Sequence, residues 1–180
     1  MSSCDRGRRG PHRFGPAAAL ALLAAFYLSG CTVQPVYGSR PDGGSVGQAL
    51  SGIQIDPVDT RIAQEVRNKL VFYMTGGAGE TSDPQYRMSL RVASAQTALG
   101  ISRTGSAPVY SVTVTASYTL TRIGSDDILL RETARGTASY DRTTQNYANI
   151  RALLDAENRA AAAAADEIRI RLAAATAAGF

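Results

Sequence analysis

The chain has few of the side chains that enzymes use for catalysis. Its 180 residues include no tryptophan, one histidine (His12) and two cysteines (Cys4 and Cys31). Beyond residue 31 there is no histidine and no cysteine, which excludes histidine general bases, Ser-His-Asp triads and most zinc sites from that part of the chain. Only a pair of carboxylates could still serve there as acid and base. The composition therefore favours binding over catalysis.

Asp126 and Asp127 are the obvious pair of carboxylates. They end the segment GSDD, residues 124–127, which is typical of a hairpin turn, where acidic residues are common for structural reasons. We therefore predict that the chain is not an enzyme, and we assign it no catalytic residue and no metal ligand. A carboxylate-dependent hydrolase of the cell envelope stays the enzymatic alternative, and it would need a cleft with two close acids.

Residues 1–30 have the pattern of a secretory signal peptide. Arginines at positions 6, 8, 9 and 13 form a basic head, and an uncharged, mostly apolar run follows from Pro16 to Leu28. That run is shorter than the about 20 residues that a transmembrane helix needs. The segment ends in LSGC, residues 28–31, which resembles the bacterial lipobox, in which the cysteine is acylated and becomes the first residue of the mature protein.

Cys31 is therefore the predicted lipid attachment site, and its acyl chains are the only non-protein group that we expect. Removal of residues 1–30 leaves Cys31 as a single thiol, which can form no internal disulfide. Each buried methylene contributes about 0.8 kcal/mol, so two or three acyl chains hold a protein on a membrane almost permanently. Thr32 directly follows Cys31, at the position where an aspartate retains the lipoproteins of enteric bacteria at the inner membrane. We expect anchoring in the inner leaflet of the outer membrane, with the protein on the periplasmic face.

The charge balance changes once the signal segment is set aside. Residues 1–30 hold four of the 19 basic and one of the 15 acidic side chains, which leaves 15 and 14, a net charge of +1. This balance gives no support to a nucleic-acid partner. The remaining length suits one modest domain. Residues 31–52 are rich in glycine, serine and proline and are predicted to be a lipidated N-terminus and flexible tether, followed by a single α+β periplasmic domain over residues 53–180.

Within that domain, hydrophobic periodicity predicts the order strand, helix, three strands, helix. An apolar stripe with a period of three to four residues indicates the first helix, and an alanine-rich run indicates the second. Alternation of apolar and polar residues indicates the strands. The expected strands are 53–55, 86–92, 110–121 and 128–139, and the expected helices are 59–75 and 147–172.

Alternation with one apolar face predicts a sheet that is covered on one side only. We therefore predict a two-layer α+β sandwich in which one mostly antiparallel four-stranded sheet packs on two helices. The first strand is expected to lie parallel to its neighbour, because a helix connects the two.

The uncovered face of this sheet would carry serine, threonine and arginine. Arginine forks match phosphates and carboxylates, and hydroxyl groups suit sugars. Such a surface could bind a phosphorylated glycan or line the wet interior of a larger protein, and the alternative is a plain solvated face. The candidate binding residues are Arg87, Arg91, Arg131 and Arg135, with Arg103 in a predicted loop over residues 97–108 as a further candidate.

Four parts of the chain together resemble a known family. They are LSGCTVQPVYG (28–38), IQIDPVDTRIAQEVRNKLVFYMTGG (53–77), the threonine-rich hairpin and the alanine-rich C-terminal helix. The chain is thereby similar to LptE, the lipopolysaccharide-assembly lipoprotein, of alphaproteobacterial type. The actual residues agree only after Cys31 and in the first helix, and elsewhere the resemblance lies in the order of the elements.

The resemblance implies a role without catalysis. Members of this family sit as a plug inside the outer-membrane β-barrel LptD, help it assemble, and assist the passage of lipopolysaccharide to the outer leaflet. Basic residues of the family are implicated in lipopolysaccharide binding. The rival interpretation is a lipoprotein accessory of another envelope machine, such as a secretin or a lipid-transport ABC system.

Overall fold

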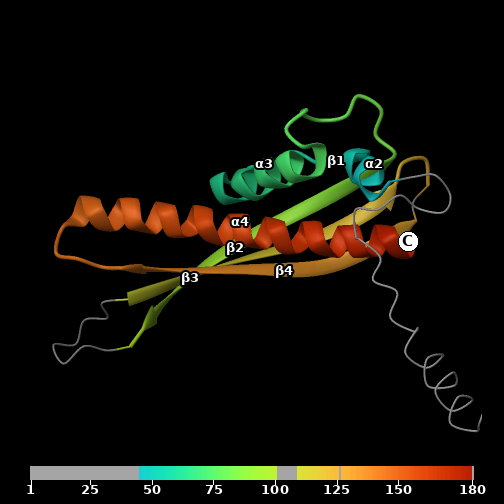
Figure 1. Ribbon diagram of the computed structural model, residues 1–180. Coiled ribbons are helices and arrows are strands. Elements are labelled where there is room, and N and C mark those ends of the chain that lie inside the picture. The colour runs from blue at the N-terminus through green and yellow to red at the C-terminus, as the bar shows by residue number, and fades with distance from the viewer. Residues whose placement is uncertain (1–44, 101–108, 126, 180) are drawn as a thin grey trace, which may run out of the picture. The chain divides into compact units, whose positions relative to one another are not determined.

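In a computed structural model, residues 45–100, 109–125 and 127–179 are described, and they form one four-stranded sheet with helices on one of its faces (Figure 1). The predicted α+β class and the predicted order of elements are confirmed, with one short helix added in front. The elements are α2 (Val46–Ser51), β1 (Ile53–Ile55), α3 (Arg61–Thr75), β2 (Tyr86–Leu99), β3 (Val109–Arg122), β4 (Ile128–Asp141) and α4 (Asn146–Ala178). No helix in these ranges is long and apolar enough to cross a membrane.

The strands lie in the order β1-β2-β3-β4. As predicted, β1 is parallel to β2, because α3 connects them, and the other pairs are antiparallel. β1 covers only the start of β2, from Tyr86 to Met88, whereas β2 and β3 pair without interruption over 14 residues. Beyond Met88, the outer side of β2 is therefore an edge of the sheet.

Local sequence signals set the limits of α3. Thr60 is its N-cap, and the side chain of Thr60 accepts a hydrogen bond from the backbone N–H of Ala63 at 3.3 Å. Gly76 ends the helix with φ 63°, a left-handed conformation that glycine adopts without a steric cost. The helix thus begins two residues after the predicted start and ends where predicted.

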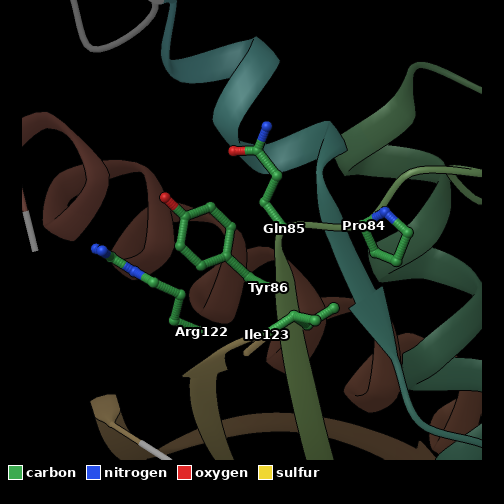
Figure 2. Close-up of a pocket in the computed structure, with 5 residues that line it drawn as sticks. All are labelled: Pro84, Gln85, Tyr86, Arg122 and Ile123. Atoms are coloured by element: carbon green, nitrogen blue, oxygen red, sulfur yellow. The ribbon is translucent and has the colours of Figure 1, made fainter. Parts of the chain in front are cut away.

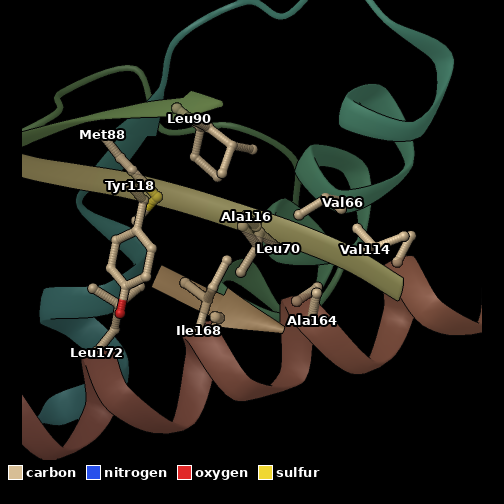
Figure 3. Packing of buried hydrophobic residues seen from close by; sticks show 14 of the residues in the cluster. Val66, Leu70, Met88, Leu90, Val114, Ala116, Tyr118, Ala164, Ile168 and Leu172 are labelled. Atoms are coloured by element: carbon tan, nitrogen blue, oxygen red, sulfur yellow. The ribbon is translucent and has the colours of Figure 1, made fainter. Parts of the chain in front are cut away.

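The core lies between the helices and the apolar face of the sheet (Figure 3). Every second residue of β3 from Val112 to Leu120 is buried against α4, which also packs on β4 and α3. The buried face of α4 consists largely of alanine, whose small side chain lets a helix approach a sheet closely. Its buried residues are Ala156, Ala160, Ala161, Ala164, Ala165, Ile168, Leu172, Ala173 and Thr176.

Gly136 of β4 lies directly against the backbone of α4. A Cβ added at this glycine would collide with the backbone carbonyl oxygen of Ala160 and lie 2.5 Å from the backbone nitrogen of Ala164. Interiors are close-packed, so no larger residue fits here without moving a backbone. The pairing of Gly136 with an alanine face is what brings the two layers together.

Three details differ from the sequence prediction. The sequence predicts a tether over residues 31–52, but residues 46–51 form α2. This helix is held in place because Val46 and Leu50 are buried in the core, although glycine and serine surround them. The loop predicted over 97–108 begins later, because pairing with β3 carries β2 on to Leu99. Tyr147 and Ile150, which belong to the periodic pattern of the last helix, are 76% and 49% exposed.

Candidate functional site

The face of the sheet opposite the helices carries all four predicted arginines. Arg87 and Arg91 extend from β2, Arg131 and Arg135 extend from β4, and all four side chains are exposed. From position 111 to position 121 the residues of β3 that point to this face are all serines or threonines, at positions 111, 113, 115, 117, 119 and 121. Two arginine-bearing strands therefore flank a central row of hydroxyl groups, and this surface is called the arginine face below.

The strand register brings Arg91 and Arg131 to two adjacent rows of this face. Arg91 is level with Ser117 of β3 and, through it, with Thr133 of β4. Arg131 is level with Thr119, which pairs with Ser89 of β2. Because adjacent strands lie about 4.8 Å apart, β2 and β4 are separated by roughly 10 Å, a gap that two extended guanidinium groups can bridge.

A hollow of about 300 Å³ lies between these two arginines. Its polar lining is held partly by a hydrogen bond between the hydroxyl groups of Ser117 and Thr133, whose oxygens are 3.0 Å apart. The lining residues are Ser89, Arg91, Ser117, Tyr118, Thr119, Arg131, Glu132 and Thr133. The hollow thus combines two cationic forks with a floor of hydroxyl groups.

The electrostatics of the arginine face are one-sided. β2 and β3 contain no carboxylate, and β4 contains two, Glu132 and, at its end, Asp141. Arg87 pairs with Asp56 at 3.8 Å, whereas in the described part of the chain Arg91, Arg131 and Arg135 form no ion pair. Unpaired arginines above hydroxyl groups suit phosphate or carboxylate groups on a sugar framework.

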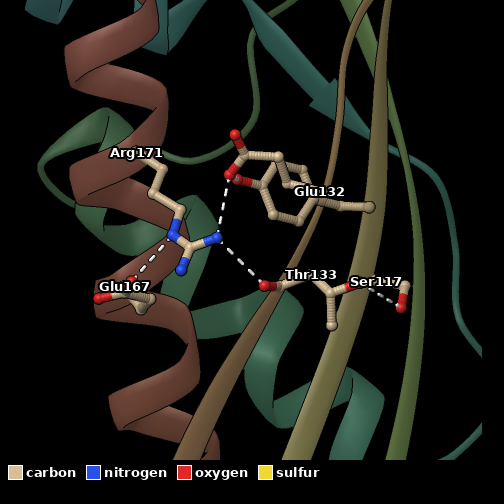
Figure 4. Close-up of polar contacts among 6 residues, drawn as sticks. Ser117, Glu132, Thr133, Glu167 and Arg171 are labelled. Carbon is tan, nitrogen blue, oxygen red and sulfur yellow. Dashed lines mark hydrogen bonds and ion pairs between the residues drawn. The ribbon is translucent and has the colours of Figure 1, made fainter.

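Glu132 lines the hollow as well, but its carboxylate bonds on the opposite side of the sheet, where it joins β4 to α4 (Figure 4). Nη1 of Arg171 donates to its carboxylate at 3.0 Å, and Nε of Arg171 donates to Glu167 at 2.8 Å. The hydroxyl group of Tyr118 donates to the same carboxylate at 3.4 Å. Burial, and next the charge of Glu132, raises the pKa of the Tyr118 phenol well above its ordinary value. The contacts that Glu132 makes with Arg171 and Tyr118 were not predicted, although a glutamate at an apolar position of an alternating strand was a usable signal.

A second hollow of about 430 Å³ lies where β2 begins and β3 ends (Figure 2). It is lined by Pro84, Gln85, Tyr86, Arg122 and Ile123. The backbone N–H of Ile123 donates to the carbonyl oxygen of Gln85 at 3.0 Å and closes this end of the sheet. The sequence did not indicate this hollow, because its residues come from two strand ends and the turns beside them, which only the pairing of β2 with β3 brings together.

The remaining candidates are placed only in part. Cys31, Arg103 and Asp126 lie outside the described residues. Asp127 lies in the turn between β3 and β4, as predicted, and its backbone carbonyl oxygen accepts from Arg122 at 3.4 Å. Among the residues that the structure describes, no group of three His, Cys, Asp or Glu side chains could hold a metal ion.

A family model described as LptE, lipopolysaccharide assembly, matches residues 50–172, which include every strand and most of α4. A search of curated proteins finds no match.

Solved structures of lipoproteins share this fold. A Caulobacter crescentus protein described as a lipoprotein is 25% identical, with a TM-score of 0.63 over 75% of this chain and 97% of that one. The rare lipoprotein B of Shewanella oneidensis is 13% identical, with a TM-score of 0.53 over 69% of this chain and 93% of its own. A minor lipoprotein of Acinetobacter baumannii is 15% identical, with a TM-score of 0.52 over 68% and 88%. The last two show a common fold only.

Proposed function

The chain belongs to the LptE family of lipopolysaccharide-assembly proteins, and from that premise we propose that it is the plug and assembly partner of an LptD-type β-barrel in the outer membrane. Membership gives a role in lipopolysaccharide assembly, within a family of non-enzymatic lipoproteins of the cell envelope. The proposal adds the barrel as partner, acylation of Cys31 as anchor, and the periplasmic face of the outer membrane as location.

One observation carries the proposal: the sheet is covered on one side and leaves an uncovered face of arginine and hydroxyl groups on the other. A water-filled barrel lumen is a polar surrounding in which such a face needs no helical layer. The apolar side, packed on α3 and α4, gives the domain a core of its own.

The arginine face is proposed to hold the phosphate groups of lipopolysaccharide. Arg91 and Arg131 line the hollow together with hydroxyl groups, and in the described part of the chain neither arginine forms an ion pair. Arg87 and Arg135 extend the positive charge along the two outer strands, and Arg103 stays a further candidate. Charged hydrogen bonds to phosphate are stronger than neutral ones, which would orient the ligand on this face.

Binding of purified lipopolysaccharide to the acylated protein in detergent tests this role. Arg91→Ala and Arg131→Ala should each weaken binding by roughly tenfold, the effect of losing one charge-assisted hydrogen bond. Arg151→Ala is the matched control, because Arg151 is an exposed arginine of α4, away from the arginine face. Equal affinities in all three variants would show that phosphate binds elsewhere. Removing the phosphates from the ligand should abolish the difference between variants.

A further inference from the structure

The two edges of the sheet differ, because within the described ranges side chains bond to the outer backbone of β4 and not to that of β2. Nη1 of Arg171 donates to the backbone carbonyl oxygen of Thr133 at 3.1 Å. Nη2 of Arg159 donates to the carbonyl oxygen of Ser139 at 2.8 Å. Both carbonyls point away from β3, so two arginines of α4 occupy hydrogen-bonding positions that another strand would need.

The outer edge of β2 has no such cover. The backbone N–H of Tyr86 donates to Gly52 and the carbonyl oxygen of Met88 accepts from Asp56, which shows that even-numbered residues of β2 face outward. The register with β3 continues unbroken to Leu99, so the same orientation holds along the strand. The outward backbone groups, unpartnered in the described part of the chain, belong to Leu90, Val92, Ser94, Gln96 and Ala98. The stretch Leu90–Leu99 is called the β2 edge.

Most of the β2 edge is also exposed above and below the sheet. Every residue from Ala93 to Leu99 is exposed, on the helix side as well as on the arginine face. This stretch, ASAQTAL, contains no charge, proline or glycine, and no bulge interrupts it. Exposed edges are normally blunted by one of these features, because a bare edge recruits other strands. Because the edge of β4 is covered and the edge of β2 is not, we interpret the edge of β2 as a binding surface.

We propose that the β2 edge pairs with an extended, uncharged segment of the barrel partner, which adds to the sheet as a fifth strand. Backbone hydrogen bonds give such an addition its affinity, and the small side chains of Ala93, Ala95 and Ala98 leave room for the incoming strand. This inference rests on the proposed function and names the surface that the partner uses.

The exposure pattern favours a surrounding partner over a second copy of this chain. A second copy that paired through its own β2 edge would lie in the plane of the sheet, and it would leave both faces of Ala93–Leu99 in water. A larger protein around the hairpin of β2 and β3 can supply a strand at the edge and side chains over both faces. The same seven residues would then be buried on three sides.

Substitutions at Ser94 separate backbone pairing from side-chain contact. Ser94→Pro removes an outward N–H and keeps the bonds to β3, because the backbone groups of the odd-numbered residues of β2 point to that strand and those of Ser94 point away from it. Ser94→Ala keeps the N–H and removes the hydroxyl group. Thr137→Pro is the matched control, because it removes an outward N–H from the covered edge of β4.

The experiment measures the amount of barrel protein that co-purifies with each acylated variant from native outer membranes. Ser94→Pro should lower recovery roughly tenfold, as the loss of one interface hydrogen bond would, while Ser94→Ala and Thr137→Pro match the unaltered chain. Thermal unfolding of the variants checks that both proline substitutions leave the domain folded. A photo-cross-linking residue in place of Ser94 should form a covalent bond to the barrel protein. This second measurement tests the proposal even if the Ser94→Pro variant unfolds.

Each other outcome overturns a distinct statement. Full recovery with Ser94→Pro, or equal losses with Ser94→Ala and Ser94→Pro, would refute strand pairing and leave the plug proposal standing. A cross-link between two copies of the chain would refute the proposed occupant. No barrel protein with the unaltered chain would refute the proposed function, and a cross-link from residue 94 to another envelope protein would then retain the β2 edge as a binding surface.

Discussion

Replacing Gly136 by alanine tests the packing of the two layers. The added methyl group would meet the backbone of α4 at Ala160 and Ala164, not the flexible end of a side chain. Neither neighbour can rotate away, so α4 must shift from β4 along part of its length. That shift would also disturb the contacts that Arg159 and Arg171 make with the carbonyl oxygens of β4.

The cost follows from known effects of overpacking. An extra methyl group in a close-packed core costs about 1–3 kcal/mol, and the rigid neighbours here place the change at the upper end, about 3 kcal/mol. Domains of this size have a total stability of about 5–15 kcal/mol. Each kcal/mol of lost stability lowers the melting temperature of such a domain by about 2–4 °C, so a loss of about 3 kcal/mol should lower it by roughly 6–12 °C.

Urea unfolding of the detergent-solubilised protein, followed by circular dichroism of the helices, measures this loss. Gly47→Ala is the control, because Gly47 is exposed in α2 and an added Cβ would meet only the Ser45 hydroxyl at 3.9 Å. That change should leave stability equal or raise it by up to about 1 kcal/mol, as alanine favours helix over glycine. A Gly136→Ala variant within about 0.5 kcal/mol of the unaltered chain would refute the close approach of α4 and β4.

Two further predictions concern buried polar groups. Burial and the charge of Glu132 raise the pKa of the Tyr118 phenol, so the folded protein keeps the phenolic proton to a higher pH than the unfolded protein does. The contribution of this group to the free energy of unfolding is therefore fully present below about pH 10. Above that pH it falls by up to about 1.4 kcal/mol per pH unit. Tyr118→Phe should flatten that fall in urea titrations at alkaline pH, and an unchanged slope would contradict the burial of the phenol. The hydroxyl group of Thr176 is buried and has no partner in the described part of the chain. Thr176→Val should therefore be neutral or stabilising by up to about 1 kcal/mol, and a loss of that size in thermal unfolding would show that the hydroxyl is bonded.

Periodicity was a sufficient guide wherever one face of an element is buried. The alternation in β4 and in the covered half of β2 gave the correct faces for Arg87, Arg91, Arg131 and Arg135, because burial against the helices imposes the pattern. The distal half of β2 is exposed on both faces, so no apolar face marks it in the sequence, which predicts a strand only as far as Val92 and a loop from Thr97. Its strand conformation comes from pairing with β3, a long-range interaction that no local pattern records.

Local composition was misleading where a few contacts outweigh it. Glycine and serine around Val46 and Leu50 indicated a tether, yet two buried side chains suffice to dock a short helix on α3 and α4. The hollow between Arg91 and Arg131 could not be predicted, because it depends on which residues of three strands share a row. The binding roles of the arginines and the lipid attachment at Cys31 stay predictions.

Affinity purification of the acylated protein from its native outer membrane in mild detergent, with partners identified by mass spectrometry, tests the central claim most directly. The account predicts a large β-barrel of the LptD type at one copy per chain. Recovery of a secretin, of components of a lipid-transport ABC system, or of no barrel protein would contradict it, and the chain would then be a lipoprotein of the LptE family that serves another envelope machine.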